Sequence, residues 1–269
     1  MTVVWLRMAI ASIVLAPFWS RLPRPDYRPG DIGWLALVCL LQPGLYYLCE
    51  NYAIGLTTSS QAGVVSAVVP LLVATGAFLF LHERISGRTL GGIALSIAGV
   101  VVLSLGSKAG AHAPNPALGD ALEFLAMVST AASMIALKHL ISRYDAWVLT
   151  GIQALSGIVL FLPGALASDP RTWASVPASG WIAVVYLGAF VSLGAFGLYA
   201  MALGRLAASR ASLAINAVPV VALLAGWLVL GESLGAVQVG GCVAIAAGVA
   251  LGQIGGGQRP EIDTAIAEG

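Results

Sequence analysis

Three ionisable side chains, Arg7, Glu50 and Glu123, stand inside long apolar stretches of the sequence. An ionisable group in hydrocarbon is costly and usually faces the interior of a helix bundle, where it meets a partner or a substrate. In one interpretation, Arg7 neutralises one or both carboxylates as a structural lock. In the other, one carboxylate carries a proton or binds the amine of a substrate. The sequence supports the two interpretations equally.

Glu50 is also part of a polar stripe. Gln42, Tyr46 and Glu50 are spaced four residues apart, which places them on one face of a helix. Such a stripe favours the wall of a cavity. Gln153 is a weaker cavity candidate, because a hydrogen bond to a neighbouring helix would satisfy its amide equally well. Lys138, near the end of its apolar stretch, fits an inner-gate contact or a topology signal equally well.

Other kinds of chemistry find little support in the sequence. The cysteines and histidines are scattered: Cys39, Cys49, Cys242, His82, His112 and His139. They form no C-x-x-C or H-E-x-x-H pattern, so we expect no disulfide, no metal site and no cofactor. No glycine-rich loop has the form that cradles phosphates. The net charge of +1 gives no reason to expect a nucleic-acid partner.

The composition places these residues in a lipid bilayer. The chain is 59% hydrophobic and 9% charged, with a mean hydropathy of +0.92, far outside the range of soluble proteins. A helix needs roughly 20 mostly apolar residues to cross the hydrocarbon, and the sequence contains about nine such runs. They are 2–18, 32–53, 60–81, 88–106, 118–140, 146–167, 179–202, 210–230 and 236–254. The predicted fold class is an all-α polytopic membrane protein, a transmembrane helical bundle.

The positive charges predict the orientation of these spans, because short loops rich in Lys and Arg stay on the cytoplasmic side. Alternate loops carry most of the cations: Arg21, Arg24, Arg28, Arg84, Arg88, Lys138, Arg143, Arg205 and Arg210. The intervening loops hold only Lys108 and Arg171. We therefore expect a multi-pass protein of a bacterial-type inner membrane, with Met1 outside. The polar tail 256–269 is expected to be cytoplasmic and disordered.

The chain contains an internal repeat. Adding 149 maps Gly55, Pro70, Glu83 and Gly99 onto Gly204, Pro219, Glu232 and Gly248. Spans one to four thus match spans six to nine, and 118–140 lacks a partner. We predict a unit of five helices, a chain that lacks its first helix, and two halves, 1–106 and 118–255, joined by a periplasmic linker at 107–117. An odd number of spans per unit gives inverted repeats, as in many secondary transporters.

Pro70 and Pro219 occupy the same place in the two repeats. Each removes a helix hydrogen bond and frees the carbonyl four residues earlier, at Ser66 and Ile215. We expect hinges at these sites and carbonyls that face a substrate near the midplane. An equally supported alternative is a packed kink in which the Ser66 hydroxyl closes onto the freed carbonyl. Asn216, three residues before Pro219, is expected to face the cavity.

Two further features of the repeat predict structural roles. Glu83 and Glu232 stand at the ends of matched spans. Each carboxylate is expected to accept hydrogen bonds from the free amides at a helix N-terminus and so to fix a turn. Glycines recur at helical spacing, including Gly99 and Gly248, and predict close packing between helices.

The chain resembles a known family in these residues. The resemblance rests on WLRMAIASIVLAP at 5–17, on the repeated pattern of proline, apolar run and Leu-x-Glu, and on GDALEFLAMVSTAASMIALKHL at 119–140. It is similar to the drug/metabolite transporter superfamily, specifically the ten-helix exporters built from two EamA-type halves. Members of this kind export amino acids, nucleosides, other metabolites or drugs. In the family, the first helix, which this chain is predicted to lack, lines the central cavity.

These observations predict a secondary transporter that exports small metabolites, foremost amino acids, by alternating access between inverted halves. Tyr46 and Tyr199, the repeat counterpart of Glu50, would accommodate a side chain. Glu50, Asn216 and the carbonyls at the helix breaks would hold polar groups. Proton coupling through Glu50 or Glu123, simple downhill export and the oligomeric state are left open. The alternative is a non-transporting sensor or an intramembrane enzyme, although an enzyme would show a convergent catalytic cluster.

Overall fold

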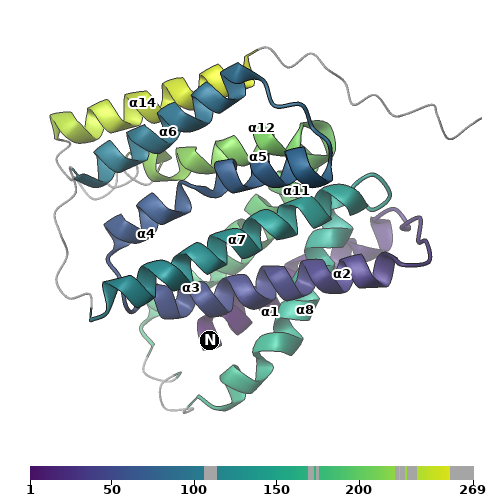
Figure 1. The fold of residues 1–269 in the computed structure, drawn as a ribbon. Coiled ribbons are helices and arrows are strands. Elements are labelled where there is room, and N and C mark those ends of the chain that lie inside the picture. Colours follow the sequence, from purple (N-terminus) through teal and green to yellow (C-terminus); the bar gives the residue numbers. More distant parts are fainter. Residues whose placement is uncertain are drawn as a thin grey trace, which may run out of the picture.

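The computed structural model describes residues 1–105, 114–168, 173, 176–221, 224, 228 and 235–254. Every regular element in this part of the chain is helical (Figure 1). The predictions for Glu232, for most of the linker 107–117 and for the tail 256–269 lie outside the described residues.

The helices correspond to the predicted spans. Seven are long and apolar enough to cross a membrane: Thr2–Arg21, Asp31–Ile54, Gln61–Phe80, Pro116–Leu140, Ala146–Leu166, Ala178–Arg205 and Ala236–Gln253. The predicted spans 88–106 and 210–230 coincide with the shorter apolar helices Gly87–Val102 and Ala208–Val221. Large apolar side chains such as Phe80, Val159 and Leu166 are more than two-thirds exposed on the outer surface, which suits contact with lipid. The all-α polytopic fold is confirmed.

Several spans are divided into shorter helical elements. The elements of the first repeat are α1 (Thr2–Leu15), η1 (Ala16–Arg21), α2 (Asp31–Cys39), η2 (Leu40–Leu45), α3 (Tyr46–Ile54), α4 (Ser59–Ser66), α5 (Val69–Phe80) and α6 (Gly87–Leu105). They are followed by α7 (Pro116–Leu140), α8 (Ala146–Leu166), α10 (Ala178–Tyr186), η3 (Leu187–Ala195), α11 (Phe196–Arg205), α12 (Ala208–Leu213), η4 (Ala214–Ala217) and α14 (Ala236–Gln253).

The unmatched helix α7 lies at the centre of the bundle. It packs against α2, α3, α4 and α5, and Figure 1 shows it running between α5 and the α2–α3 span. Its buried face carries small and polar residues, among them Glu123, Ser129 and Ser133. On another side, α1 packs against α8 and η3. The arrangement brings the first and second repeats together around α7 and α1.

Glycines allow α6 and α14 to pack backbone to backbone, at the edge of the bundle in Figure 1. A Cβ atom on Gly92 would lie 2.5 Å from the carbonyl oxygen of Gly248, and one on Gly99 would lie 2.9 Å from that of Gly241. Gly241 and Gly248 are the repeat counterparts of Gly92 and Gly99. Any larger residue would therefore force the two helices apart.

The span that contains Pro70 is broken before the proline. α4 ends at Ser66 and α5 begins at Val69. Pro70 thus occupies the first turn of a new helix, where its missing amide costs nothing. The span is therefore interrupted at Ala67 and Val68, just before Pro70. In the second repeat, α12 gives way to the 3-10 turn η4 at the matching place, just before Pro219.

Candidate functional site

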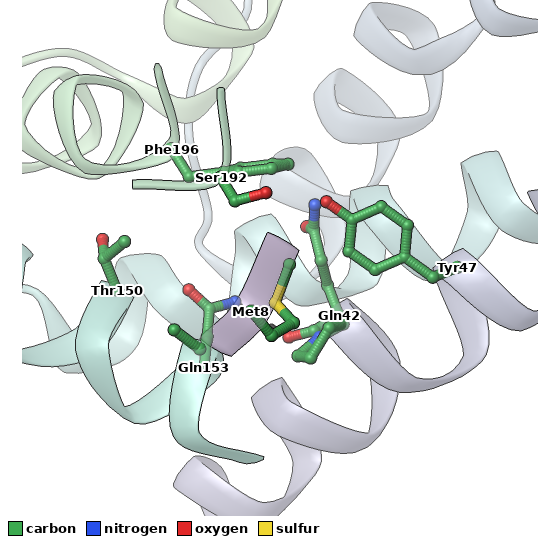
Figure 2. A pocket seen from close by; sticks show the side chains of 9 residues that line it. Met8, Gln42, Tyr47, Thr150, Gln153, Ser192 and Phe196 are labelled. Atoms are coloured by element: carbon green, nitrogen blue, oxygen red, sulfur yellow. Dashed lines mark hydrogen bonds between the residues drawn. The ribbon is translucent and has the colours of Figure 1, made fainter. Parts of the chain in front are cut away.

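A small cavity lies where α1, η2, α3, α8, η3 and α11 meet (Figure 2). Its walls are formed by Met8, Gln42, Pro43, Tyr47, Thr150, Gln153, Ala154, Ser192 and Phe196. About 20 Å³ is open to a water-sized molecule, which is room for about one water. Mixed apolar walls with a few converging polar groups are typical of small-molecule sites. A metabolite would need the cavity to widen from this conformation.

Equivalent segments of the two repeats bound this cavity. η2 and η3 are π-helical turns inside long spans, and such turns are frequent at functional sites. Pro43 in η2 and Ser192 in η3 are repeat counterparts, and both line the cavity. The cavity therefore lies where matching parts of the two repeats approach each other.

Gln153 supports one wall of the cavity. Gln42, which precedes Pro43, has an extended backbone with φ −142° and ψ 113°, as expected for a residue before proline. The Gln153 side chain donates from Nε2 to the Gln42 carbonyl oxygen at 2.9 Å. The sequence allowed two roles for Gln153, cavity lining and a hydrogen bond to a neighbouring helix, and in this structure Gln153 has both.

Arg7 lies beside the cavity and contacts two of its walls. Its Nε donates to Ser192 Oγ at 3.2 Å, and its Nη2 donates to the Tyr47 hydroxyl at 3.1 Å. Its Cζ lies 5.1 Å from the centre of the Tyr47 ring, within the range of a cation–π contact. Among the described residues, no carboxylate lies within 4.0 Å of Arg7. Of the two interpretations of Arg7, direct pairing with Glu50 or Glu123 is therefore not found in this structure. The arginine donates instead to Tyr47 of its own repeat and to Ser192 of the other repeat.

Glu50 is half-buried on α3 and bonds within its own helix. The Tyr46 hydroxyl donates to Glu50 Oε1 at 2.5 Å. The Tyr46 ring lies edge-on to Tyr47, with 4.8 Å between ring centres. Tyr46 and Glu50 are thus one residue layer away from the cavity and are linked to it through Tyr47.

Glu123 is buried on α7, facing α4. Its Oε1 lies 2.8 Å from Ser66 Oγ, which also lies 2.9 Å from the carbonyl oxygen of Ala62. Ser66 therefore does not close onto a carbonyl freed by Pro70. The serine hydroxyl has one proton and can donate to only one of these two oxygens. Glu123 Oε2 is buried and has no hydrogen-bond partner among the described residues.

Two predicted cavity residues lie elsewhere. Tyr199 packs beside the main core and contacts Met134 Sδ through its hydroxyl at 3.1 Å. Asn216 is 2% exposed, and its Nδ2 donates to Ser96 Oγ at 2.8 Å and to the Ala67 carbonyl oxygen at 3.4 Å. Neither residue lines the cavity described above, because α11 and η4 turn these side chains toward neighbouring helices.

Lys138 and Glu83 hold the turn between α11 and α12. Lys138 Nζ donates to the carbonyl oxygens of Leu203 and Leu206 at 2.5 and 2.6 Å, at the end of α11. Glu83 Oε1 accepts from the amide of Ala208 at 2.9 Å, at the start of α12. Glu83 caps a helix N-terminus as the sequence indicated, but the helix belongs to the other repeat.

A buried ion pair anchors the loops at the start of α2. Arg143 Nη2 lies 2.6 Å from Asp31 Oδ1, and the Tyr144 hydroxyl donates to Asp31 Oδ2 at 3.1 Å. Burial of the Tyr144 ring, together with the neighbouring Asp31 carboxylate, raises the pKa of the phenol. The hydroxyl therefore stays a hydrogen-bond donor through the neutral range. The pair joins the loop before α2 to the turn between α7 and α8.

The sequence did not identify most of the cavity wall. Tyr47, Thr150, Ser192 and Phe196 were missed, as was Met8. Ser192 carried a usable signal, because it is a hydroxyl in an apolar span at the position that matches Pro43. Tyr47 stands beside the polar stripe but five residues from Gln42, where an α-helical spacing does not place it on the same face.

A larger hollow of about 280 Å³ between α1 and α8 is lined mainly by apolar groups: Ser12, Leu15, Ala16, Trp19, Gly151 and Leu155. Ser12, its one hydroxyl, bonds to the Met8 carbonyl oxygen of its own helix. The described part of the chain contains no group of three or more His, Cys, Asp or Glu side chains that could hold a metal ion.

Comparison with known proteins relates the chain to membrane transporters. The chain is 27% identical to an uncharacterized transporter, YetK, of Bacillus subtilis, over 91% of this chain and 75% of the relative. It is 27% identical to a probable terminal-alkyne amino-acid exporter of Streptantibioticus cattleyicolor, over 96% and 86%. It is 28% identical to a probable amino-acid metabolite efflux pump of Escherichia coli, over 83% and 76%.

The fold and the family agree with these relatives. One crystal structure matches with a TM-score of 0.76 and 21% identity, over 94% of this chain and 86% of the other, which shows that the fold is shared. The model of the EamA-like transporter family matches residues 1–105 and again residues 117–252. The chain therefore belongs to the EamA-like transporter family, within the drug/metabolite transporter superfamily, and is a multi-pass membrane transporter.

Proposed function

We propose that this transporter is a secondary exporter of small metabolites, with amino acids as its foremost substrates, working by alternating access between two inverted halves. The observation that carries the proposal is the cavity between η2 and η3, which are matching segments of the two repeats. Two relatives named as amino-acid exporters or efflux pumps support this substrate class.

The proposed halves are residues 1–106 and 118–255, with 107–117 as the linker. The helix breaks next to Pro70 and Pro219 would act as hinges, since broken backbone in a membrane is tolerated only beside protein or a cavity. Asn216 joins these two breaks through its bond to the Ala67 carbonyl. In this proposal Asn216 is part of the hinge and not of the substrate-binding wall.

For export coupled to protons, Glu123 is a better candidate than Glu50 for the residue that carries the proton. A buried carboxylate oxygen without a donor is costly, and Glu123 Oε2 has none among the described residues. A protonated Glu123 could also donate to Ser66 Oγ, which would leave the serine proton for Ala62. Glu50 already receives the Tyr46 hydroxyl. We therefore assign the proton to Glu123.

The proposed location is a bacterial-type inner membrane with the C-terminus in the cytoplasm. The distribution of arginines and lysines between alternate loops supports this orientation. Fusing alkaline phosphatase or green fluorescent protein to Gly269 tests it. The proposal expects fluorescence and no phosphatase activity, whereas active phosphatase would place the C-terminus outside.

Counterflow in proteoliposomes tests the transport function. Vesicles loaded with one unlabelled amino acid should accumulate the labelled form of that amino acid transiently, and a panel of amino acids and nucleosides identifies the substrate. Glu123→Gln should abolish accumulation driven by a pH gradient while exchange persists, as expected for the loss of a proton carrier. Glu50→Gln, in equally well-folded protein, should keep both activities. If no panel member exchanges in well-folded protein, the amino-acid assignment fails and a non-transporting role takes its place.

A further inference from the structure

We infer that Arg7 is the anchor for a carboxylate of the transported molecule. The inference rests on the proposed export function and deepens it, because it names the chemical group that the cavity selects and the residue that selects it. Molecules that carry the same side chain and amine but lack the carboxylate are then poor substrates.

The first argument is that Arg7 makes no direct ion pair, although Glu50 lies near enough to interact with it electrostatically. The guanidinium reaches Ser192, which stands near the middle of the Ala178–Arg205 span. An arginine that only snorkelled to the headgroups would point along α1 toward the interface. Instead, Arg7 meets two neutral oxygens, from Ser192 and Tyr47, and no carboxylate within 4.0 Å among the described residues. A charge at this depth favours a counter-ion strongly.

The second argument is the geometry of the guanidinium. It presents five N–H groups in a planar fork that matches the two oxygens of a carboxylate. Its contacts to the described residues are one hydrogen bond from Nε and one from Nη2. The fork therefore keeps donor capacity for an anion, and such charge-assisted pairs are roughly twice as strong as neutral hydrogen bonds.

The third argument is the position of Arg7 relative to the cavity. Both oxygens that it contacts belong to cavity-lining residues, one on α3 and one on η3. Figure 2 shows the Ser192 and Tyr47 side chains reaching into the same space as Gln42 and Met8. A carboxylate that bound Arg7 would place the rest of the molecule among Met8, Phe196 and the two glutamines.

The small volume of the cavity links this binding to movement. About 20 Å³ does not hold a carboxylate group, so binding must separate the walls. The Arg7–Ser192 contact joins the first repeat to the second. When a substrate carboxylate binds, Arg7 would give up its hydrogen bond to Ser192 and donate to the carboxylate, and the walls would part. When the substrate leaves, Arg7 would bond to Ser192 again.

The experiment compares amino acids with their amides as competitors of counterflow. The amide keeps the amine and side chain and replaces the carboxylate by a neutral group. With wild-type protein, each amide should compete at least about tenfold more weakly than its acid, the loss expected for one charge-assisted hydrogen bond. Arg7→Gln should abolish this preference, and Arg7→Lys should retain part of it. Arg88→Gln, which alters an exposed arginine at the start of α6, should leave it unchanged.

Ser192→Ala distinguishes two roles for Arg7, binding a substrate carboxylate and tying the two repeats together. It removes the Nε contact but leaves the guanidinium. The inference predicts that Ser192→Ala keeps the acid-over-amide preference, whereas a tie predicts that it behaves like Arg7→Gln. Amides that compete as well as acids with wild-type protein would overturn the anchor and leave the export function intact.

A second measurement keeps the inference testable if no amino acid is transported. The unfolding midpoint of protein in nanodiscs is followed with acetate, propionate and butyrate and with the matching amides, at ionic strength equalised with sodium chloride. The carboxylates should raise the wild-type midpoint by about 2 °C more than the amides do, and Arg7→Gln should remove the difference. Equal shifts in wild-type and Arg7→Gln protein would overturn the anchor.

Discussion

The side-chain nitrogen of Asn216 lies 3.4 Å from the carbonyl oxygen of Ala67, the residue that holds the same position in the other repeat, 149 residues earlier. The contact therefore joins the α4–α5 break of the first repeat to η4, the matching turn of the second. The contact is supported by a second bond from Asn216 to Ser96 Oγ at 2.8 Å.

Asn216→Ala should lower the free energy of unfolding by about 1 kcal/mol, because it removes the donor to Ser96 Oγ and to the Ala67 carbonyl oxygen. Ser96→Ala removes the other partner of the stronger bond. A double-mutant cycle in mixed micelles should give a coupling of about 1 kcal/mol between the two positions. Additive effects of the two substitutions would show that this bond contributes nothing.

Gly92→Ala should separate α6 from α14. The new Cβ would lie 2.5 Å from the Gly248 carbonyl oxygen, and such overpacking costs about 1–3 kcal/mol. Gly240→Ala is the matched control, because a Cβ on this α14 glycine meets nothing within 4 Å. The control should be neutral or slightly stabilising. Equal thermal stability of the two variants would contradict the close packing.

Asp31→Asn should destabilise the protein more than a change at an exposed ion pair does, because it takes the counter-ion from the mostly covered Arg143. The Asp31 side chain is 3% exposed in its pair with Arg143. Asp26 offers a control, since its pair with Arg28 spans 3.6 Å and both side chains are more than 60% exposed. Asp26→Asn should change the stability by less than about 1 kcal/mol. Chemical unfolding of both variants measures the difference, and similar losses would contradict this account.

Glu83→Ala should loosen the turn between α11 and α12. It removes the acceptor for the Ala208 amide, a loss of about 1 kcal/mol for a helix cap. Arg84→Ala changes the exposed neighbour and should be neutral. Hydrogen exchange of the Ala208 and Ser209 amides should accelerate in the first variant alone. Unchanged protection in Glu83→Ala would show that the cap is dispensable.

Much of the fold follows from the sequence, because hydrophobic length alone locates a membrane helix. The repeat also predicted which glycines correspond. In the structure Gly92 packs against Gly248, the counterpart of Gly99, and Gly99 packs against Gly241, the counterpart of Gly92. The sequence could not predict which distant helix a single side chain would contact. Glu83 ends its span as expected, yet it caps a helix that lies 125 positions away in the chain.

The candidate site was harder to predict, for a reason visible in η2. The stripe of Gln42, Tyr46 and Glu50 assumes an unbroken α-helix with 3.6 residues per turn. The π-helical turn and the extended Gln42 shift the register at this point. Tyr47 therefore joins Gln42 at the cavity, and Tyr46 turns away toward Glu50. Likewise, the sequence shows that Arg7 stands inside an apolar span but not in which direction its side chain points.

Alkylation of a cysteine placed at Ser192 tests the central claim that the cavity between the repeats is the transport site. Cys39, Cys49 and Cys242 are first replaced by alanine, and Ser192→Cys is compared with Leu198→Cys, which lies on the next turn of the same span and is 61% exposed. Exchange is measured before and after treatment with N-ethylmaleimide, so folding is complete before the cavity is filled. The account predicts that alkylated Ser192→Cys stops exchanging, that substrate slows its alkylation, and that alkylated Leu198→Cys continues. Full exchange by completely alkylated Ser192→Cys would contradict it.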